Sequence, residues 1–248
     1  MTIFAAEELD AMRDCAWVLK EIVRDLEKAL KPGLATRVLD RLAGQLVENY
    51  GVRAAFKGYR GYPASITASV NEEVIDGVPG DRELRDGDLL KLQLGVESDG
   101  LHAYWANTYE IGASVPERAK ELLASARRAM QEAARRCTPG QPVEEISRAI
   151  EDTISGAGFV VVRQYCGHGI GRRMHEEPQI PCYVDPRLAG RYRLSEREVL
   201  ALQVLALDKP ARLSNKGGLT VVAPKGTHSV HVGAILATAA APEVMLGG

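Results

Sequence analysis

The spacing of hydrophobic residues predicts two helices at the start of the chain. Between residues 5 and 30 the apolar positions recur every three or four residues, which places them on one face of a helix. Lys31-Pro32-Gly33 ends this helix, because proline cannot continue the hydrogen-bond ladder and glycine favours a turn. A second helix is predicted over 37–50, with Thr36 as its N-cap.

The next part of the chain has the alternating pattern of strands. Residues 65–74 alternate between apolar and polar side chains and predict a strand. Residues 89–96 and 101–112 predict a hairpin, because Asp99-Gly100 between them is a strong turn signal.

The second half of the chain repeats this order of elements. Helices are predicted over 116–137 and 142–156, and they are followed by strands over 159–165, 199–207, 219–223 and 231–238, with a glycine-rich loop after the first. Each half therefore has a long helix, a proline-glycine break, a shorter helix and strands. We interpret residues 1–248 as one domain built from a coarse duplication, with halves of about 1–112 and 113–248.

Composition narrows the classes of function. The formal net charge of −2 argues against nucleic-acid binding through a basic field, and 46% hydrophobic residues is typical of a globular chain. The first twenty residues are too charged for a secretory signal, and no stretch is long and apolar enough to cross a bilayer. The four cysteines form no CxxC motif. We therefore expect a cytoplasmic protein with no nucleic-acid or membrane partner.

One segment carries a family resemblance. Residues 165–178, YCGHGIGRRMHEEP, resemble the signature of type I methionine aminopeptidases. The segments 61–65 (GYPAS), 69–80 and 86–88 (DGD) also fall at the spacing of that family. The resemblance implies the pita-bread fold, an α/β (α+β) fold of two pseudo-symmetric halves around a central antiparallel sheet, with the site between the halves.

The resemblance also implies a dinuclear metal centre, which the residues of this chain contradict. The family holds two divalent metals with two Asp, one His and two Glu. The corresponding residues here are Gln93, Tyr104, His168, Gln203 and, counting back from Thr238, Val232. All four carboxylates are replaced by neutral side chains, whereas hard divalent ions need anionic oxygen ligands. Glu97 lies about 13 Å along the strand from Gln93 and cannot substitute. We predict no metal and no other cofactor.

Other residues of the family's pocket are retained. His175 matches a histidine that contacts the substrate amide, and Asp76 occupies the position of a second substrate-side histidine. Tyr62 and Cys166 match residues that line the methionine side-chain pocket. The candidate catalytic residues are therefore His168, His175 and Asp76, and the candidate substrate-binding residues are Tyr62, Gln93, Tyr104, Trp105, Cys166 and Gln203.

Three functions are considered for a chain with these residues. The first is a repurposed metal-independent hydrolase, lyase or isomerase that uses histidine acid–base chemistry on a small amide, amino-acid-like or carbonyl substrate. Creatinase-like enzymes, which resemble this architecture and lack metals, are a precedent. The alternative is a non-catalytic pseudoenzyme that binds a peptide N-terminus or a protein partner. An active metal-dependent methionine aminopeptidase is the third reading. The expected ligand is small or peptide-like, and the expected assembly is a monomer or homodimer.

Other roles remain open for several of these residues. Asp76, His168 and His175 could form a mononuclear metal site. Cys166 is either a nucleophile beside His168 or, as in the family, part of the pocket lining. His228 and His231 are expected at the surface or at a sheet edge.

Overall fold

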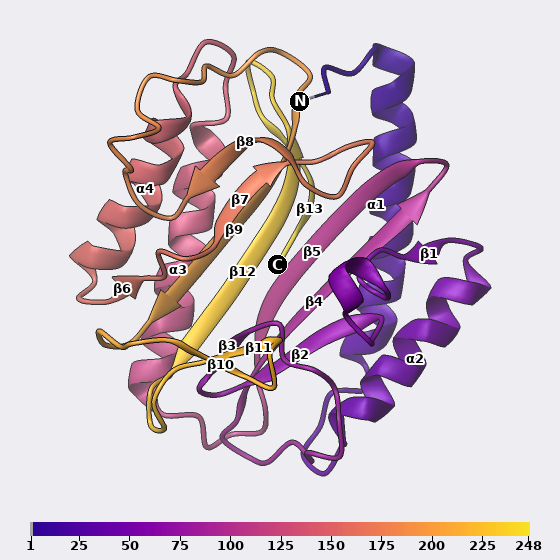
Figure 1. The fold of residues 1–248 in the computed structure, drawn as a ribbon, viewed down its shortest axis with the longest axis vertical. Helices are drawn as coiled ribbons and strands as arrows, with labels where there is room; N and C mark the ends of the chain where they lie inside the picture. Colours follow the sequence, from indigo (N-terminus) through magenta and orange to yellow (C-terminus); the bar gives the residue numbers. More distant parts are fainter. Residues whose placement is uncertain (1) are drawn as a thin grey trace.

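A central antiparallel sheet forms the middle of the molecule. The computed structural model describes residues 2–248, and it places ten strands in this sheet. The path β1-β4-β5-β12-β9-β7-β8 crosses both halves of the chain, while β2, β13 and β6 pair with β4, β12 and β9 respectively (Figure 1). The strands are β1 Arg53–Ala54, β2 Ile66–Val70, β4 Leu89–Ser98, β5 Leu101–Glu110, β6 Val160–Val161, β7 Cys166–Gly169, β8 Glu176–Pro181, β9 Val199–Leu207, β12 Ser229–Ala237 and β13 Glu243–Gly247.

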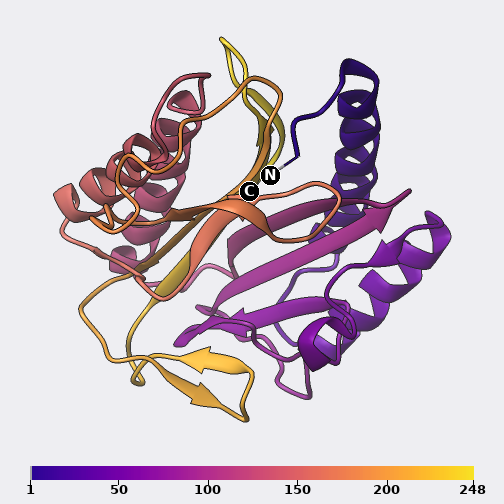
Figure 2. The same ribbon diagram turned by 45° about the horizontal axis from the view of Figure 1, so that its top comes forward.

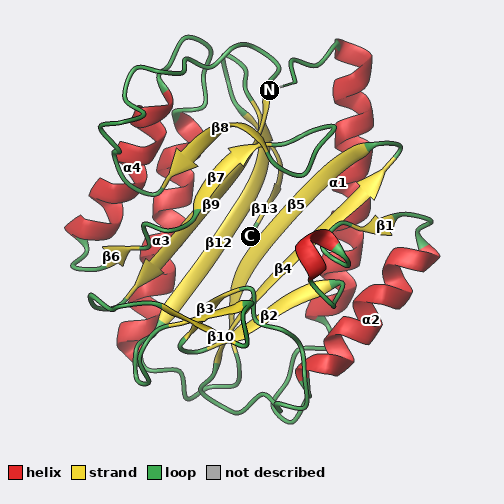
Figure 3. Ribbon diagram, viewed as in Figure 1, coloured by secondary structure: helices red, strands yellow, loops and turns green. Residues whose placement is uncertain are grey.

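All four α-helices cover one face of this sheet and leave the other face for the site (Figure 3). They are α1 Ala6–Glu27, α2 Thr36–Asn49, α3 Glu117–Arg135 and α4 Val143–Gly156. The first two pack with the strands of the N-terminal half, and the last two pack with those of the C-terminal half. Of the helices within residues 2–248, none has the length and apolar composition needed to span a bilayer.

The predicted elements are largely confirmed, with instructive differences. Thr36 is not the N-cap but the first residue of α2, and its hydroxyl exchanges hydrogen bonds with the backbone of Gly80. The predicted strand 65–74 is two strands, β2 and β3 Glu73–Ile75, because Asn71 turns the chain at φ 54°. The connection between β5 and α3 contains the predicted boundary near residue 112.

The glycine-rich segment is structured, whereas the sequence predicted a loop. It forms β7, whose His168 pairs with Ala201 on β9. A Cβ atom at Gly167 would lie 2.7 Å from the carbonyl oxygen of Ala201, so only glycine permits this close approach of two backbones. The close contact between β7 and β9 thus explains why a glycine precedes His168.

A second, smaller sheet closes the far side of the site. It joins β3 from the N-terminal half to β10 Ser214–Lys216 and β11 Thr220–Val222 from the C-terminal half, in the order β10-β11-β3. Figure 2 shows the β10–β11 hairpin projecting beyond the main sheet. Asp76, which directly follows β3, is thereby brought to the cavity described next.

Candidate functional site

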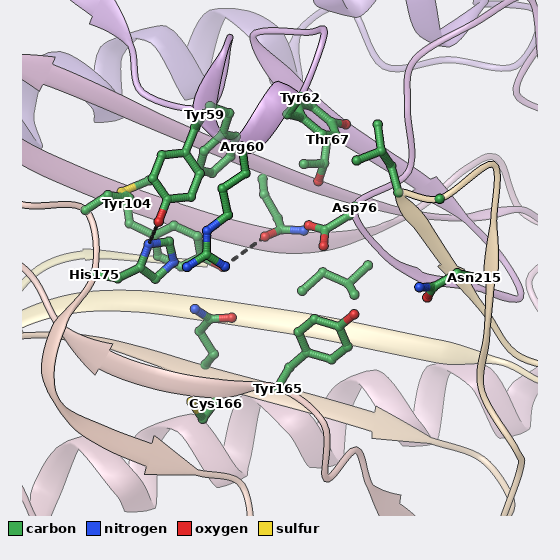
Figure 4. Close-up of a pocket in the computed structure, with 17 residues that line it drawn as sticks. Tyr59, Arg60, Tyr62, Thr67, Asp76, Tyr104, Tyr165, Cys166, His175 and Asn215 are labelled. Carbon is green, nitrogen blue, oxygen red and sulfur yellow. Dashed lines mark hydrogen bonds between the residues drawn. The ribbon is translucent and has the colours of Figure 1, made fainter.

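A cavity of about 410 Å³ lies on the helix-free face of the main sheet (Figure 4). Seven of the predicted site residues line it: Tyr62, Asp76, Gln93, Tyr104, Cys166, His175 and Gln203. The prediction did not include the other lining residues: Phe56, Tyr59, Arg60, Thr67, Ile75, Tyr165, Met174, Asn215, Gly218 and Leu219. Two predicted residues, His168 and Trp105, are not part of the lining.

The floor of the cavity is a row of residues that crosses five strands. Each residue of the row pairs with the next one on the neighbouring strand, so all their side chains point to the same face of the sheet. The row, from β9 through β12, β5 and β4 to β2, is Gln203, Gly233, Ala106, Gln93 and Thr67.

Val232, the residue at the predicted position of the last family carboxylate, does not face the cavity. Counting back from Thr238 gave Val232, but Val232 pairs with Val204 and belongs to the buried cluster under α3 and α4. The residue on the cavity face is Gly233, one position further. A shift of one residue exchanges the two faces of a strand, and counting along the sequence cannot detect it.

Tyr104 fills the space beside Gly233. A Cβ atom at position 233 would lie 2.8 Å from Cε1 of Tyr104 and 2.9 Å from Cβ of Ala106. Burial raises the pKa of the Tyr104 phenol well above its ordinary value, so the hydroxyl stays protonated. The Tyr104 hydroxyl donates to Oε1 of Gln93 at 3.3 Å, which leaves the Nε2 donor of that amide free for another partner.

His231 extends this buried hydrogen-bond chain, and its predicted surface position is wrong. The residue is fully buried, and its Nε2 lies 3.1 Å from the Tyr104 hydroxyl. Burial lowers the pKa of His231 to about 3, so the ring is neutral. His228 is half-buried, and its Nδ1 lies 2.9 Å from a carboxylate oxygen of Asp208.

Trp105 is the clear error among the predicted substrate-binding residues. It is 2% exposed and packs in the hydrophobic cluster under α1, with its ring centroid 6.1 Å from that of Tyr109. Neighbouring residues of a strand point to opposite faces, so Tyr104 in the cavity places Trp105 in the core.

The two histidines of the signature segment lie together but in different environments. Their ring centroids are 4.3 Å apart. His168 is 5% exposed and its Nδ1 donates to the carbonyl oxygen of Gly169 at 2.9 Å, while burial lowers its pKa to about 4. His175 lines the cavity, with its Nδ1 3.0 Å from the Tyr59 hydroxyl. Burial, and then the nearby positive charge of Arg60, lower the pKa of His175. Both rings are therefore neutral at neutral pH, and His175 alone faces the cavity.

Asp76 supplies a carboxylate to the cavity wall. It is half-buried, and desolvation raises its pKa to about 6. Its charge in turn adds to the raised pKa values of Tyr62, Tyr104 and Tyr165, for which burial is the larger cause. At neutral pH the carboxylate is mostly ionised, and it can accept a proton or bind a cationic group.

Tyr62 and Cys166 line the cavity without activated groups. The Tyr62 hydroxyl donates to the carbonyl oxygen of Gly77 at 2.8 Å, so it is already engaged in holding the segment that follows β3. Burial raises the pKa of the Cys166 thiol, which keeps it protonated and argues for lining over nucleophilic attack.

A metal-ligand cluster is not formed by the residues that the structure describes. Across residues 2–248, no three His, Cys, Asp or Glu side chains converge as ligands of one ion. The mononuclear site considered for Asp76, His168 and His175 is therefore not supported, because the three side chains do not converge.

Arg60 and Thr67 are the most informative residues that the sequence reasoning missed. Thr67 pairs with Gln93, so extending the cavity row by one strand would have identified it. Arg60 lies in a 3-10 turn, Tyr59–Gly61, two residues before Tyr62. The position of Arg60, two residues before the predicted pocket residue Tyr62, was the signal in the sequence that could have identified it.

Comparisons with known proteins agree on one group of relatives. The model of metallopeptidase family M24 matches residues 10–232. The chain is 37% identical over 196 residues to methionine aminopeptidase 1 of Bacillus subtilis, which is 79% of this chain and 78% of that protein. It is 36% identical over 226 residues to the methionine aminopeptidase of Borreliella burgdorferi, covering 91% and 89% of the two chains.

Solved structures confirm the predicted pita-bread fold. The crystal structure of methionine aminopeptidase from Thermotoga maritima matches with a TM-score of 0.93 at 30% identity, over 99% of this chain and 98% of that one. A prolidase from Pyrococcus furiosus matches with a TM-score of 0.78 at 18% identity, over 98% of this chain and 64% of that one, and this likeness concerns the fold alone.

Proposed function

The chain belongs to metallopeptidase family M24 and resembles its methionine aminopeptidases. We propose that, within this family, its cavity works without a dinuclear metal centre. In this proposal the cavity binds an amino-acid-like ligand or a short peptide. His175 then exchanges a proton with the bound ligand, and Asp76 holds the cationic end of that ligand.

The donors in the cavity support the absence of a dinuclear centre. The floor offers the amides of Gln93 and Gln203, the protonated phenol of Tyr104 and no side chain at Gly233. Two divalent cations require several anionic oxygen ligands to balance their charge. The space where a side chain at position 233 would begin is occupied by the Tyr104 ring. These residues therefore do not fit the metals that the family implies.

Two unsatisfied polar atoms carry the ligand-binding part of the proposal. Nε2 of Gln93 and Oγ1 of Thr67 are buried and have no hydrogen-bond partner among the described residues. Their side chains are 4% and 3% exposed, and both residues line the cavity. A buried polar group without a partner costs about 1–3 kcal/mol. A ligand with a carbonyl or carboxylate oxygen would satisfy the Gln93 donor.

The acid–base part rests on the position of His175. Its ring is neutral at neutral pH, it lines the cavity, and the Tyr59 hydroxyl at its Nδ1 fixes its orientation. A neutral histidine can take up a proton from a ligand and return it. His168 is a positioning residue in this proposal, since it packs behind the His175 ring.

A second candidate is non-catalytic binding of a peptide N-terminus. The observation that favours it is the burial of His168 and His231, which leaves His175 as the one histidine that lines the cavity. A binding module would need the cavity and the unsatisfied amide but no proton transfer. The two candidates therefore differ in turnover and agree in ligand binding.

Metal analysis tests the first part of the proposal. Purified protein that is equilibrated with Co²⁺, Mn²⁺ or Zn²⁺ and then dialysed should retain well under one metal ion per chain, because the cavity lacks carboxylate pairs. Elemental analysis of the dialysed sample measures this directly. Two equivalents held per chain would contradict the proposal.

Turnover separates the two candidate functions. We expect L-methionyl-L-alanine to be hydrolysed slowly in the presence of EDTA, and His175→Gln to lower that rate by about 10²-fold, the usual contribution of a general acid or base. Release of free L-methionine is the measurement, and His228→Gln, which removes a histidine outside the cavity, is the matched control. Binding of the dipeptide without turnover would instead favour the binding module.

A further inference from the structure

Two opposite charges face the same cavity without pairing. Arg60 and Asp76 both line it, and Figure 4 shows both side chains directed into the space between the walls. Neither one forms an ion pair with any described residue. A cation and an anion that share one cavity and leave each other unpaired can each bind one end of a ligand that carries both charges.

Arg60 is held in place by its backbone and by an aromatic neighbour. Its φ of 48° lies in the left-handed region, which is uncommon for a residue with a Cβ atom. The turn that contains it is flanked by Gly58 and Gly61, which also have positive φ values. The guanidinium carbon lies 5.4 Å from the centre of the Tyr59 ring. The positive charge of Arg60 also contributes to the lowered pKa of His175. This turn therefore presents a guanidinium beside the proposed acid–base residue.

Asp76 is held at the cavity wall by the small sheet. Its φ of 59° is also left-handed, and its backbone carbonyl accepts a hydrogen bond from the Thr220 hydroxyl at 3.2 Å. The carboxylate is half-buried beside the phenols of Tyr62 and Tyr165. Two uncommon backbone conformations thus direct opposite charges into one cavity.

The floor of the cavity supplies a neutral donor. The Tyr104 hydroxyl engages Oε1 of Gln93 and so turns the NH₂ group of that amide toward the ligand. A guanidinium binds a carboxylate with two parallel hydrogen bonds, and a carboxylate binds an ammonium group. The apolar lining, including Phe56 and Met174, provides room for an apolar side chain.

We propose that the cavity selects small zwitterions, either a free α-amino acid or a dipeptide, whose carboxylate binds Arg60 and whose ammonium group binds Asp76. This inference rests on the proposed function, that the cavity binds an amino-acid-like ligand, and it adds the ligand class. A longer peptide has an amide where the small zwitterion has a carboxylate, so it lacks the group that Arg60 recognises. A volume of about 410 Å³ is in the range of small-molecule sites.

Calorimetric titration at pH 7.5 with EDTA present tests this selection. L-methionine and L-methionyl-L-alanine are each compared with their C-terminal amides, which keep the ammonium group and lose the carboxylate. We expect each amide to bind at least about tenfold more weakly than its free acid, as for loss of a charge-assisted hydrogen bond. The difference between the two free acids tells whether the amino acid or the dipeptide fits better.

Substitutions of Arg60 and Asp76 test which group of the ligand each charge binds. Arg60→Gln should remove the preference for the free acids, while Arg60→Lys should keep part of it, because lysine retains the charge and loses the bidentate geometry. Lys57→Gln is the matched control, since it removes an exposed cation nearby that does not line the cavity. Asp76→Asn should weaken the binding of all four ligands and leave N-acetyl-L-methionine, which has no ammonium group, unchanged.

The outcomes separate this inference from the function on which it rests. Amides that bind as tightly as the free acids, with no effect of Arg60→Gln, would overturn the zwitterion selection and leave ligand binding intact. If none of these compounds binds, the amino-acid-like ligand of the proposed function is wrong as well.

Discussion

Replacing Gly233 with glutamate is expected to destabilise the protein by about 3 kcal/mol or more, the combined cost of overpacking and of burying an unpaired charge. The new Cβ atom would lie 2.8 Å from Cε1 of Tyr104 and 2.9 Å from Cβ of Ala106, inside a strand at the centre of the sheet. Denaturant unfolding monitored by circular dichroism measures the change. Gly247→Glu is the matched control, because a Cβ atom there meets nothing closer than 3.6 Å and the position is exposed.

A double-mutant cycle attributes the effect to the Tyr104 ring. With Tyr104→Ala in the background, we expect Gly233→Glu to cost at least about 1 kcal/mol less, since residues in contact are coupled by 0.5–3 kcal/mol. The Ala106 contacts remain in both backgrounds, so part of the cost should persist. Equal costs in the two backgrounds would mean that Tyr104 does not fill the space of a side chain at position 233.

The pH dependence of stability should be dominated by Lys91, by about 3 kcal/mol between pH 6 and pH 9. Lys91 is fully buried, and its Nζ donates to the carbonyl oxygen of Asn71 at 2.5 Å and to Oγ of Ser229 at 2.9 Å. Burial lowers its pKa to about 7, and this outweighs the nearby charges of Glu72, Glu73 and Asp88. An unfolded lysine titrates near 10.4, so between pH 7 and 10 the unfolded state binds more protons and stability rises with pH.

The comparison with Lys91→Met isolates this contribution. The rise in unfolding free energy from pH 6 to pH 9 should be about 3 kcal/mol larger in the unmodified protein than in the variant, at 1.4 kcal/mol for each pKa unit. Lys209→Met is the control, because Lys209 also donates to a backbone carbonyl, that of Gly226, but is exposed. Parallel pH curves for the protein and Lys91→Met would mean that the surrounding acceptors keep the buried ammonium group charged.

The local pattern of apolar residues and turn signals was sufficient to predict most elements of the fold. The helices α1 to α4, the β4–β5 hairpin at Asp99-Gly100 and strand β9 were predicted within a few residues, because their apolar periods and turn signals are strong. The short strands β1, β7 and β8 were missed, and β6 covers only two residues of the predicted strand 159–165. They are held by pairing with distant strands, and a segment of two to six residues carries too weak a period to be recognised alone.

The sequence predicted most of the residues of the site but not how they are arranged. Seven of the nine candidate residues line the cavity, since the signature segment and the hairpin fix their identity. The errors concern the direction in which a strand residue points and the position of its strand in the sheet. Trp105 points into the core, on the side of the strand opposite to Tyr104, and His231 is fully buried although it was predicted at the surface or at a sheet edge.

The sequence by itself determined the family and the helices, because these follow from residue identity and local spacing, and it supplied the hypothesis of a cavity without a dinuclear metal centre. The tertiary structure alone decided which side chains meet. It aligned Gln203, Gly233 and Gln93 in one row, seated Tyr104 beside Gly233, and brought Arg60 and Asp76 to one cavity. Strand register and left-handed turns set these contacts, and both depend on packing between segments that are far apart in the chain.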